Sequence, residues 1–146
     1  MSALSANNIG LMTRVISAIV HTAKSSTAIY KGGFLMQNID GDVLPLTTTA
    51  GQFAGIALDE KATTTTDRKT RVSESGEFLA TLTGVAKADI GKPVFCAYDD
   101  PADITLTWAT TTKYIGKIVA LEYDSTGAVT DKCWVRYDAR LGVQGS

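Results

Sequence analysis

Histidine, cysteine and clustered carboxylates are the residues of this chain that could do chemistry, and none has a spacing typical of a catalytic centre. The chain has one histidine, His21, and no Gly-x-Ser-x-Gly elbow accompanies it, so a Ser-His-Asp or Cys-His centre lacks support. The segment Lys31-Gly32-Gly33 lacks the spacing of a phosphate-binding loop and the Lys-Ser/Thr pair that follows one. We therefore predict that the protein is not an enzyme and that His21 is packed or lies on the surface.

A second group with possible chemistry is the acidic cluster of Asp99, Asp100 and Asp103 around Pro101. Carboxylates this close in sequence could ligate Ca²⁺ through oxygen, although their spacing differs from that of an EF-hand loop. Asp-Asp-Pro is also common in turns, where the side chains hydrogen-bond the nearby backbone. We favour the turn, and we expect no metal site and no cofactor; an ion bound at this loop stays open as the alternative.

The two cysteines, Cys96 and Cys133, lie far apart in the sequence and match neither a metal-binding nor a disulfide-rich spacing. Each stands in a strand-like segment, where a free thiol packs as a small hydrophobic side chain. We predict two free thiols in strands, which suits folding in a reducing cytosol.

The aromatic residues Trp108, Trp134, Tyr98 and Tyr137 could stack bases or sugars, as in barrels that bind single strands. Such a site needs a basic groove, but the net charge is −1 and basic residues are offset by acidic neighbours. The offset is clearest in one threonine-rich segment: Lys61, Arg68, Lys69 and Arg71 stand among Asp59, Glu60, Asp67 and Glu74. We expect this segment to be a solvated loop and the aromatic rings to pack in the core or at a subunit interface.

Strands and turns must position these residues, because the chain alternates short apolar runs with turn-forming residues. The expected turns are Asn38-Ile39-Asp40-Gly41, as a type I′ hairpin; Glu74-Ser75-Gly76, between strands at 71–72 and 78–82; and Asp124-Ser125-Thr126-Gly127, between strands at 114–123 and 133–137. Glycines inside apolar segments suggest bulges or close backbone approach at Gly55, Gly84 and Gly116. The pattern predicts an all-β barrel or sandwich.

Composition bounds the remaining organisation. A chain of 146 residues, 45% hydrophobic and 20% charged, fits one soluble domain. No stretch reaches the roughly 18 apolar residues of a membrane span, and the N-terminus lacks the basic start of a signal peptide. Met1 to Met12 are small and polar, which predicts an extended arm. Thr13 to Ala23 fit either a helix or a strand, and we favour the strand because Val and Ile are concentrated there.

The order of motifs from Ile29 to Tyr137 points to a family. The segments, in order, are Ile29-Tyr30-Lys31-Gly32-Gly33-Phe34-Leu35, Leu44-Pro45-Leu46, Phe53-Ala54-Gly55-Ile56-Ala57, Ser75-Gly76-Glu77-Phe78, Ala88-Asp89-Ile90-Gly91-Lys92-Pro93-Val94-Phe95, Asp99-Asp100, Tyr114-Ile115-Gly116-Lys117-Ile118 and Cys133-Trp134-Val135-Arg136. Each segment alone is ordinary strand-and-turn sequence, and their order is the specific part. In this order the chain resembles the capsid decoration, or cement, proteins of tailed bacteriophages.

The resemblance implies a small β-barrel or β-sandwich-like domain of the β-tulip type over residues 28–146, with an N-terminal arm and lead-in segment over residues 1–27. It implies a structural protein of the virion, often a homotrimer, which is made in the host cytoplasm and binds the major capsid protein on the outer surface of the head. Neither nucleic acid nor membrane is an expected partner. Because such proteins reach the capsid with the arm, the expected capsid-binding residues are Ser2, Leu4, Asn7, Asn8, Ile9, Leu11 and Met12. The alternative is a small β-barrel module that binds single-stranded nucleic acid or carbohydrate on Trp108 and Trp134.

Overall fold

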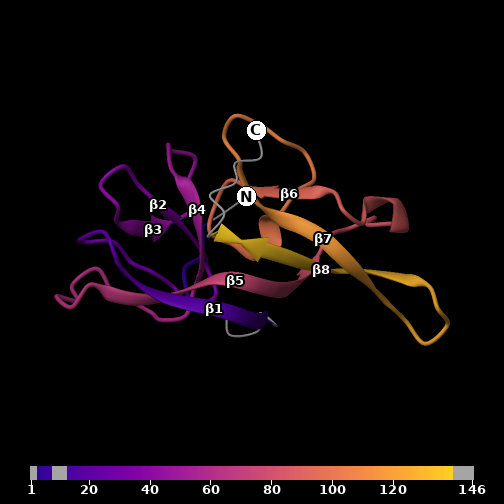
Figure 1. Ribbon diagram of the computed structural model, residues 1–146, viewed down its shortest axis with the longest axis horizontal. Helices are drawn as coiled ribbons and strands as arrows, with labels where there is room; N and C mark the ends of the chain where they lie inside the picture. The colour runs from indigo at the N-terminus through magenta and orange to yellow at the C-terminus, as the bar shows by residue number, and fades with distance from the viewer. Residues whose placement is uncertain (1–2, 8–12, 140–146) are drawn as a thin grey trace.

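The computed structural model describes residues 3–7 and 13–139, and it is built almost entirely from antiparallel β-strands (Figure 1). The strands in chain order are β1 (Thr13–Thr22), β2 (Phe34–Gln37), β3 (Val43–Pro45), β4 (Gln52–Ala57), β5 (Lys69–Thr81), β6 (Pro93–Cys96), β7 (Lys113–Tyr123) and β8 (Val129–Asp138). Two single-turn 3-10 helices, η1 (Lys87–Asp89) and η2 (Pro101–Asp103), complete the elements of the described part. The all-β fold class expected from the sequence is confirmed.

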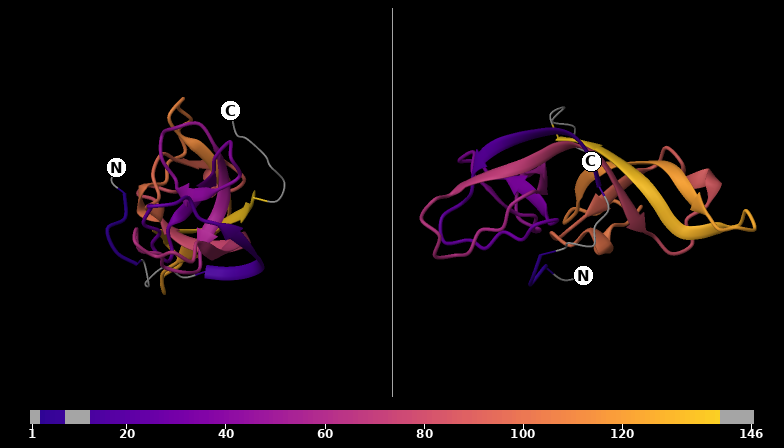
Figure 2. Two further views of the ribbon diagram at one scale, coloured as in Figure 1. Left: turned by 90° about the vertical axis from the view of Figure 1, so that its left-hand side faces the viewer. Right: turned by 90° about the horizontal axis from the view of Figure 1, so that it is seen from below.

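The longest strand, β5, organises the sheet because both of its edges are paired. Along one edge it pairs with β1, from Thr13 opposite Phe78 to Thr22 opposite Lys69. On the other edge its first half pairs with β4 and its second half with β8. The sheet continues from β4 to β2 and β3, and from β8 to β7 and β6. It therefore has a first lobe (β2–β4) and a second lobe (β6–β8), which β5 and β1 join (Figure 2).

The hairpin expected at Glu74-Ser75-Gly76 is wrong, since β5 runs through these residues without a turn. Gly76 has Val15 of β1 opposite it on one edge and Tyr137 of β8 on the other. Ser, Glu and Gly favour turns when the backbone has no other partners. Here two neighbouring strands supply backbone hydrogen bonds on both sides, and these outweigh the local preference.

Residues 13–22 form a strand, as favoured from the sequence, and the chain just beyond this strand closes the first lobe. Ala23 forms a parallel bridge with Val43 of β3, and Lys24 N donates to the carbonyl oxygen of Val43 at 2.8 Å. Strands β1, β5, β4, β2 and β3 thereby curl around a small core, whose members are Ala23, Ile29, Leu35, Val43, Ala54, Ala57 and Val72. This sheet includes β1, which lies on the arm side of the boundary expected at residue 27.

A larger core lies on the other face of β2. Phe34 and Met36 belong to this core whereas Leu35 belongs to the small one, because successive side chains of a strand point to opposite faces. The aromatic rings meet edge to face, with 5.6 Å between the ring centroids of Phe34 and Phe53 and 5.5 Å between those of Phe34 and Phe78. Burial on both faces explains why β2 is a continuous apolar run rather than an alternating one.

Two of the three glycines expected at strand irregularities lie at shifts of register. Gly55 marks the shift between β2 and β4, and Gly116 marks the shift between β6 and β7. A Cβ at Gly116 would collide with the carbonyl oxygen of Arg136 on β8, so only glycine allows this close approach. The expectation for Gly84 is wrong, because it lies in a turn after β5 with φ of 79°.

The turn at Asn38–Gly41 is confirmed in position but not in type. A type I′ turn needs positive φ at both central residues, yet of these residues only Gly41 has it, at 84°. Gly41 N donates to the carbonyl oxygen of Asn38 at 3.1 Å, and Asn38 Oδ1 accepts hydrogen bonds from the amides of Asp40 and Asp42. A left-handed glycine after the two central residues is typical of the three-residue hairpin loop with a bulge. The turn expected at Asp124–Gly127 is confirmed between β7 and β8.

Candidate interaction surfaces

Within residues 3–7 and 13–139, no group of three or more His, Cys, Asp or Glu side chains could hold a metal ion. His21 lies in β1, where it is half-buried and opposite Thr70 of β5. No helix of the described residues is long and apolar enough to cross a membrane.

The acidic cluster lies in the turn that leads from β6 into η2. Asp100 Oδ1 accepts a hydrogen bond from Ala102 N at 3.0 Å and caps η2. Asp99 is 2% exposed, and its Oδ1 accepts from Leu4 N at 2.8 Å. Burial raises the pKa of the Asp99 carboxyl group, and the hydrogen bond from Leu4 partly opposes this. The turn favoured from the sequence is confirmed, and Asp99 additionally holds the N-terminal segment.

The described part of the N-terminal arm, residues 3–7, lies on the surface of its own domain. Besides the bond from Leu4 to Asp99, Lys31 N donates to Asn7 Oδ1 at 2.9 Å. A Cβ at Gly33 would lie 2.9 Å from Leu4 Cδ1, so the glycine makes room for this half-buried leucine. Leu4 and Asn7, two of the expected capsid-binding residues, thus bind loops of the same chain. The others lie outside the described residues: Ser2, Asn8, Ile9, Leu11 and Met12.

Strand β1 forms one border of the sheet and carries exposed apolar side chains. In the described part of the chain, β1 pairs with β5 alone. Ala18 is exposed, Ile19 is 42% exposed and Val20 is 59% exposed. Because Ile19 and Val20 point to opposite faces, their exposure means that neither face of β1 is covered at this point. An edge strand with exposed apolar side chains is a surface on which another strand can add.

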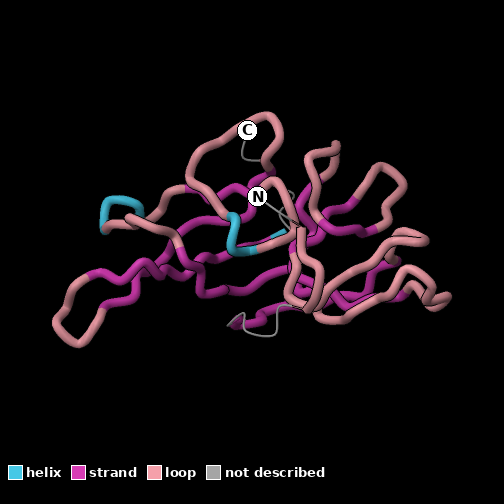
Figure 3. Tube along the Cα trace, turned by 180° about the vertical axis from the view of Figure 1, so that it is seen from behind, coloured by secondary structure: helices cyan, strands magenta, loops and turns pink. Residues whose placement is uncertain are grey.

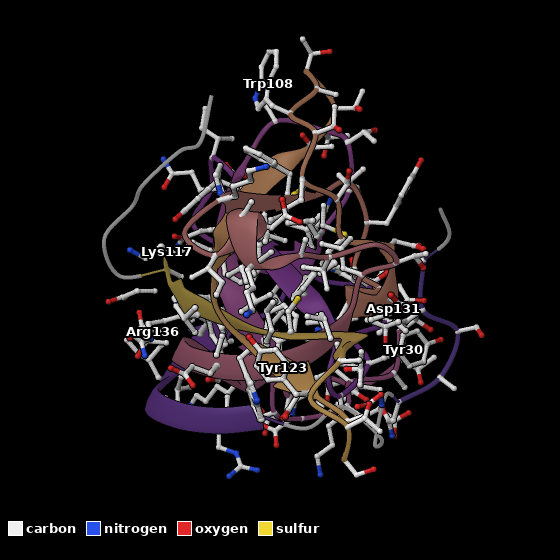
Figure 4. All side chains as sticks on the ribbon, turned by 90° about the vertical axis from the view of Figure 1, so that its right-hand side faces the viewer. Tyr30, Trp108, Lys117, Tyr123, Asp131 and Arg136 are labelled. Carbon is white, nitrogen blue, oxygen red and sulfur yellow. The ribbon has the colours of Figure 1, made fainter. Side chains whose placement is uncertain are left out.

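The loop between η2 and β7 presents Trp108 on one side of the molecule. The side chain is 48% exposed, and Figure 4 shows it projecting away from the body of the protein. Hydrogen bonds within the loop hold its shape: Ala109 N donates to Thr112 Oγ1 at 3.0 Å, and Thr107 N donates to Thr105 Oγ1 at 3.1 Å. Thr105 also bridges to Phe95 of β6. The loop therefore presents the indole from a well-supported backbone.

Trp134, the other tryptophan considered as a stacking residue, is covered. It lies in β8, is 7% exposed, and donates from Nε1 to Glu122 Oε1 of β7 at 2.9 Å. Tyr137 is also buried, with its hydroxyl 2.6 Å from Ser73 Oγ. The structure therefore does not join Trp108 and Trp134 into one exposed aromatic surface.

Lys113, which no sequence motif indicated, joins two loops on the side of the molecule that bears Trp108. It is the first residue of β7, is 8% exposed, and donates from Nζ to the carbonyl oxygen of Thr47 at 2.5 Å. Burial lowers the pKa of its ammonium group. Residues 47–51 and 105–112 contain no charged side chain. Because the Lys113 side chain is buried, it adds no charge to the surface of these two loops. A lone lysine between a threonine tract and an apolar strand is the only sequence signal of this role.

The basic residues of the threonine-rich segment bind within the chain. The Arg68 guanidinium donates to the backbone carbonyl oxygens of Lys24 and Thr27. Arg71 pairs with Asp59 at 2.7 Å, and this hydrogen-bonded pair holds the pKa of Asp59 below its usual value. Arg71 lies in β5, in agreement with the strand expected at residues 71–72, and the solvated loop expected for this segment ends before β5 begins at Lys69. The pair of Arg71 with Asp59 agrees with the prediction that acidic neighbours offset the basic residues of this segment.

Both cysteines are free and buried, as predicted, Cys96 in β6 and Cys133 in β8. Burial raises the pKa of each thiol to about 11, so neither is a reactive thiolate at neutral pH.

Comparison with family models, with curated proteins and with solved structures found no match for this chain.

Proposed function

We propose that this protein is a capsid decoration protein, which binds the outer surface of a tailed-phage head and stabilises contacts between major capsid protein subunits. The order of motifs from Ile29 to Tyr137 suggests the class of protein. The observation that carries the proposal is the apolar outer border of β1, where Ile19 and Val20 are both exposed. Proteins usually protect such an edge with charged residues, proline, a bulge or a covering segment. Strand β1 has register shifts between Val15 and Ala18, but residues 18–20 contain neither a charged residue nor proline. The edge is therefore suited to receive a strand from a partner protein.

In this proposal a strand of the capsid protein adds to β1. Backbone hydrogen bonds supply affinity, and the side chains of Ile19 and Val20 supply specificity through the pockets that they fill. Leu4 and Asn7 support the site by holding the N-terminal segment against the domain. Several copies acting together on a symmetric head multiply the attachment by about 10²–10⁴. No catalytic residue is needed for this role.

The test replaces the apolar border of β1 by charge. Because both side chains are exposed, Ile19→Lys with Val20→Lys keeps the core intact while it opposes strand addition. We expect the wild-type protein to co-sediment with undecorated heads of the phage that encodes it, and the double variant to stay in the supernatant. The matched control is Ile90→Lys, because Ile90 is 46% exposed and lies at the end of η1.

Two outcomes would contradict the proposal. If the wild-type protein fails to bind the heads, the decoration function itself is wrong. If the double variant binds as well as the wild type, the capsid contact lies elsewhere than β1. No observation favours the nucleic-acid or carbohydrate module, since only one of its two tryptophans is exposed.

A further inference from the structure

We propose that Lys117 of β7 and Arg136 of β8 form a binding site for a carboxylate, which an acidic side chain of a partner protein supplies. This deepens the proposed function by naming the chemistry of the partner, and it rests on that function only for the partner's identity as the capsid protein. Binding of a carboxylate to these two residues is a property of the protein in solution. It can be measured without any capsid.

A row of charged residues, which we call the charged row, crosses the sheet at this site. Lys117 lies opposite Arg136, and Arg136 in turn lies opposite Glu77 of β5. Glu77 lies opposite Arg14 of β1 in backbone register. The charged row therefore joins four neighbouring strands and contains three basic residues and one acidic residue.

The side chains of Lys117 and Arg136 lie on the face of the sheet that points away from the larger core. Their neighbours in the strands, Ile118 and Tyr137, are buried in that core, and successive side chains of a strand point to opposite faces. Both basic residues are exposed, and Figure 4 shows their side chains projecting on the same side of the molecule. Directly opposite residues have Cβ atoms about 4.5–5.5 Å apart, so a single carboxylate can contact both.

The two cations are not balanced by acidic partners within residues 3–7 and 13–139. Arg136 donates from Nε and Nη2 to one oxygen, Glu77 Oε2, at 2.8 and 2.5 Å. These bonds use two of the five N–H groups of the guanidinium, which leaves donors for a second carboxylate. Lys117 has no ion pair in the described part of the chain, although it lies opposite a cation and like charges so placed are destabilising. A bound carboxylate offsets this repulsion.

The strands hold the two cations in position before any ligand binds. Gly116, the neighbour of Lys117, approaches the carbonyl oxygen of Arg136 so closely that a Cβ would collide with it. This contact fixes β7 against β8 at the site itself, and Glu77 holds the guanidinium from the adjoining strand. A site whose groups are already positioned loses less entropy on association.

An acidic protein segment is the ligand that this charge arrangement fits. A guanidinium beside an ammonium group matches the two oxygens of one carboxylate. Nucleic acid needs several cations along its backbone, and the net charge of −1 opposes its approach. The charged row ends at β1, where the capsid strand is proposed to add, and three strand spacings, roughly 14 Å, separate β7 from β1. A partner bound at β1 can therefore reach the site with a neighbouring segment.

The experiment titrates the isotope-labelled protein with acetylated tetraglutamate in about 0.1 M salt and follows NMR spectra. We expect saturable shifts of the Lys117 amide and the Arg136 Nε–H resonances, and none with tetraglutamine. Because an exposed ion pair contributes modestly, Lys117→Gln should raise the dissociation constant about three-fold and Lys117→Glu about ten-fold or more.

The matched control is Lys132→Glu, which makes the same change in net charge at another exposed lysine. Lys132 lies in β8, four residues from Arg136 towards the tip of the β7–β8 hairpin, which projects from the body of the protein (Figure 3). This separation is about 13 Å, beyond the screening length of about 10 Å at this salt concentration. We therefore expect the control to bind tetraglutamate as the wild type does.

Four outcomes decide between the alternatives. An absence of shifts, or shifts that persist unchanged in Lys117→Glu, overturns the inference. A short oligothymidylate that binds the charged row more tightly than tetraglutamate overturns the choice of an acidic protein partner. Head binding by the wild type that Lys117→Glu fully retains overturns this inference alone. A protein that binds tetraglutamate through the charged row yet ignores heads overturns only the decoration function.

Discussion

Buried polar side chains in this protein fix loops to one another. Asp99 accepts a hydrogen bond from Leu4 N, and Lys113 donates to the carbonyl oxygen of Thr47. Each bond joins segments that are distant in sequence, and each takes a charge away from the surface. At the residue scale, the consequence is that buried charged residues determine the positions of the loops, while exposed residues supply the candidate contacts.

Substitutions of Asp99 test whether a buried polar side chain fixes the N-terminal segment to a loop. Asp99→Ala removes the acceptor for Leu4 N and should release residues 3–7, whereas Asp99→Asn keeps an acceptor oxygen and should retain them. Hydrogen exchange of the Leu4 amide distinguishes the two variants. Rapid exchange in both would show that the carboxylate charge, and not the acceptor, holds the segment.

The same residue predicts a pH dependence. Burial raises the pKa of Asp99 in the folded state above its unfolded value, so between these two values the folded protein binds more protons. The contribution of Asp99 to stability therefore rises as the pH falls through this interval. The melting temperature of the wild type minus that of Asp99→Asn should be lowest near neutral pH. This difference should increase as the solution is acidified. An unchanged difference between pH 7 and pH 3 would contradict this.

The buried thiols make a second prediction at this scale. Since burial raises the pKa of Cys96 and Cys133 to about 11, iodoacetamide at pH 8 should leave the folded protein unmodified. After denaturation without reductant, both thiols should react, which intact mass shows as two additions. A mass two protons short, restored by reductant, would instead reveal a disulfide.

The strands of this protein depend on a few positions where backbones come unusually close. Gly116 of β7 faces the carbonyl oxygen of Arg136 on β8, and Gly55 of β4 faces Ser73 of β5. A side chain at either position would push paired strands apart. At the element scale, these close contacts allow both lobes to curl while the paired strands keep their backbone hydrogen bonds.

Substitutions at Gly116 and Gly84 should distinguish the cost of a close backbone contact from the cost of a positive φ angle. We expect Gly116→Ala to lower the free energy of unfolding by about 3 kcal/mol or more, because the new methyl group meets backbone that cannot move alone. Gly84→Ala is the matched control: it has open space but positive φ, which costs about 1–2 kcal/mol. Urea unfolding measures both. Equal losses of unfolding free energy in the two variants would mean that the close contact with Arg136 does not destabilise the Gly116→Ala protein further.

The two lobes depend on the same central strand, because β5 pairs with β4 of the first lobe and with β8 of the second. β5 pairs with β4 through residues 72–73 and with β8 through residues 75–81, so neither lobe keeps its sheet when β5 is lost. The small core and the larger core also share β2 and β4. At the scale of the whole molecule, we expect a single unfolding transition.

This expectation can be checked with Trp134 as a reporter in the second lobe. In a Trp108→Phe background, Trp134 is the one remaining tryptophan. Ile29→Ala, in the small core of the first lobe, should cost about 2–5 kcal/mol. It should shift the Trp134 fluorescence transition as far as the circular dichroism transition. A circular dichroism loss that precedes the fluorescence change would mean that the first lobe unfolds separately.

The sequence by itself determined the β class, the turns at 38–41 and 124–127, and the burial of both thiols, because these follow from residues a few positions apart. Only the tertiary structure decided the course of β5, since Glu74-Ser75-Gly76 is extended only when β1 and β8 supply partners on both edges. It also decided that Trp134 is covered and Trp108 is exposed, which no local pattern distinguishes. The burial of Lys113 is also not predictable from local sequence, because its partner, the carbonyl oxygen of Thr47, lies 66 residues away along the chain. Only folding brings the two together.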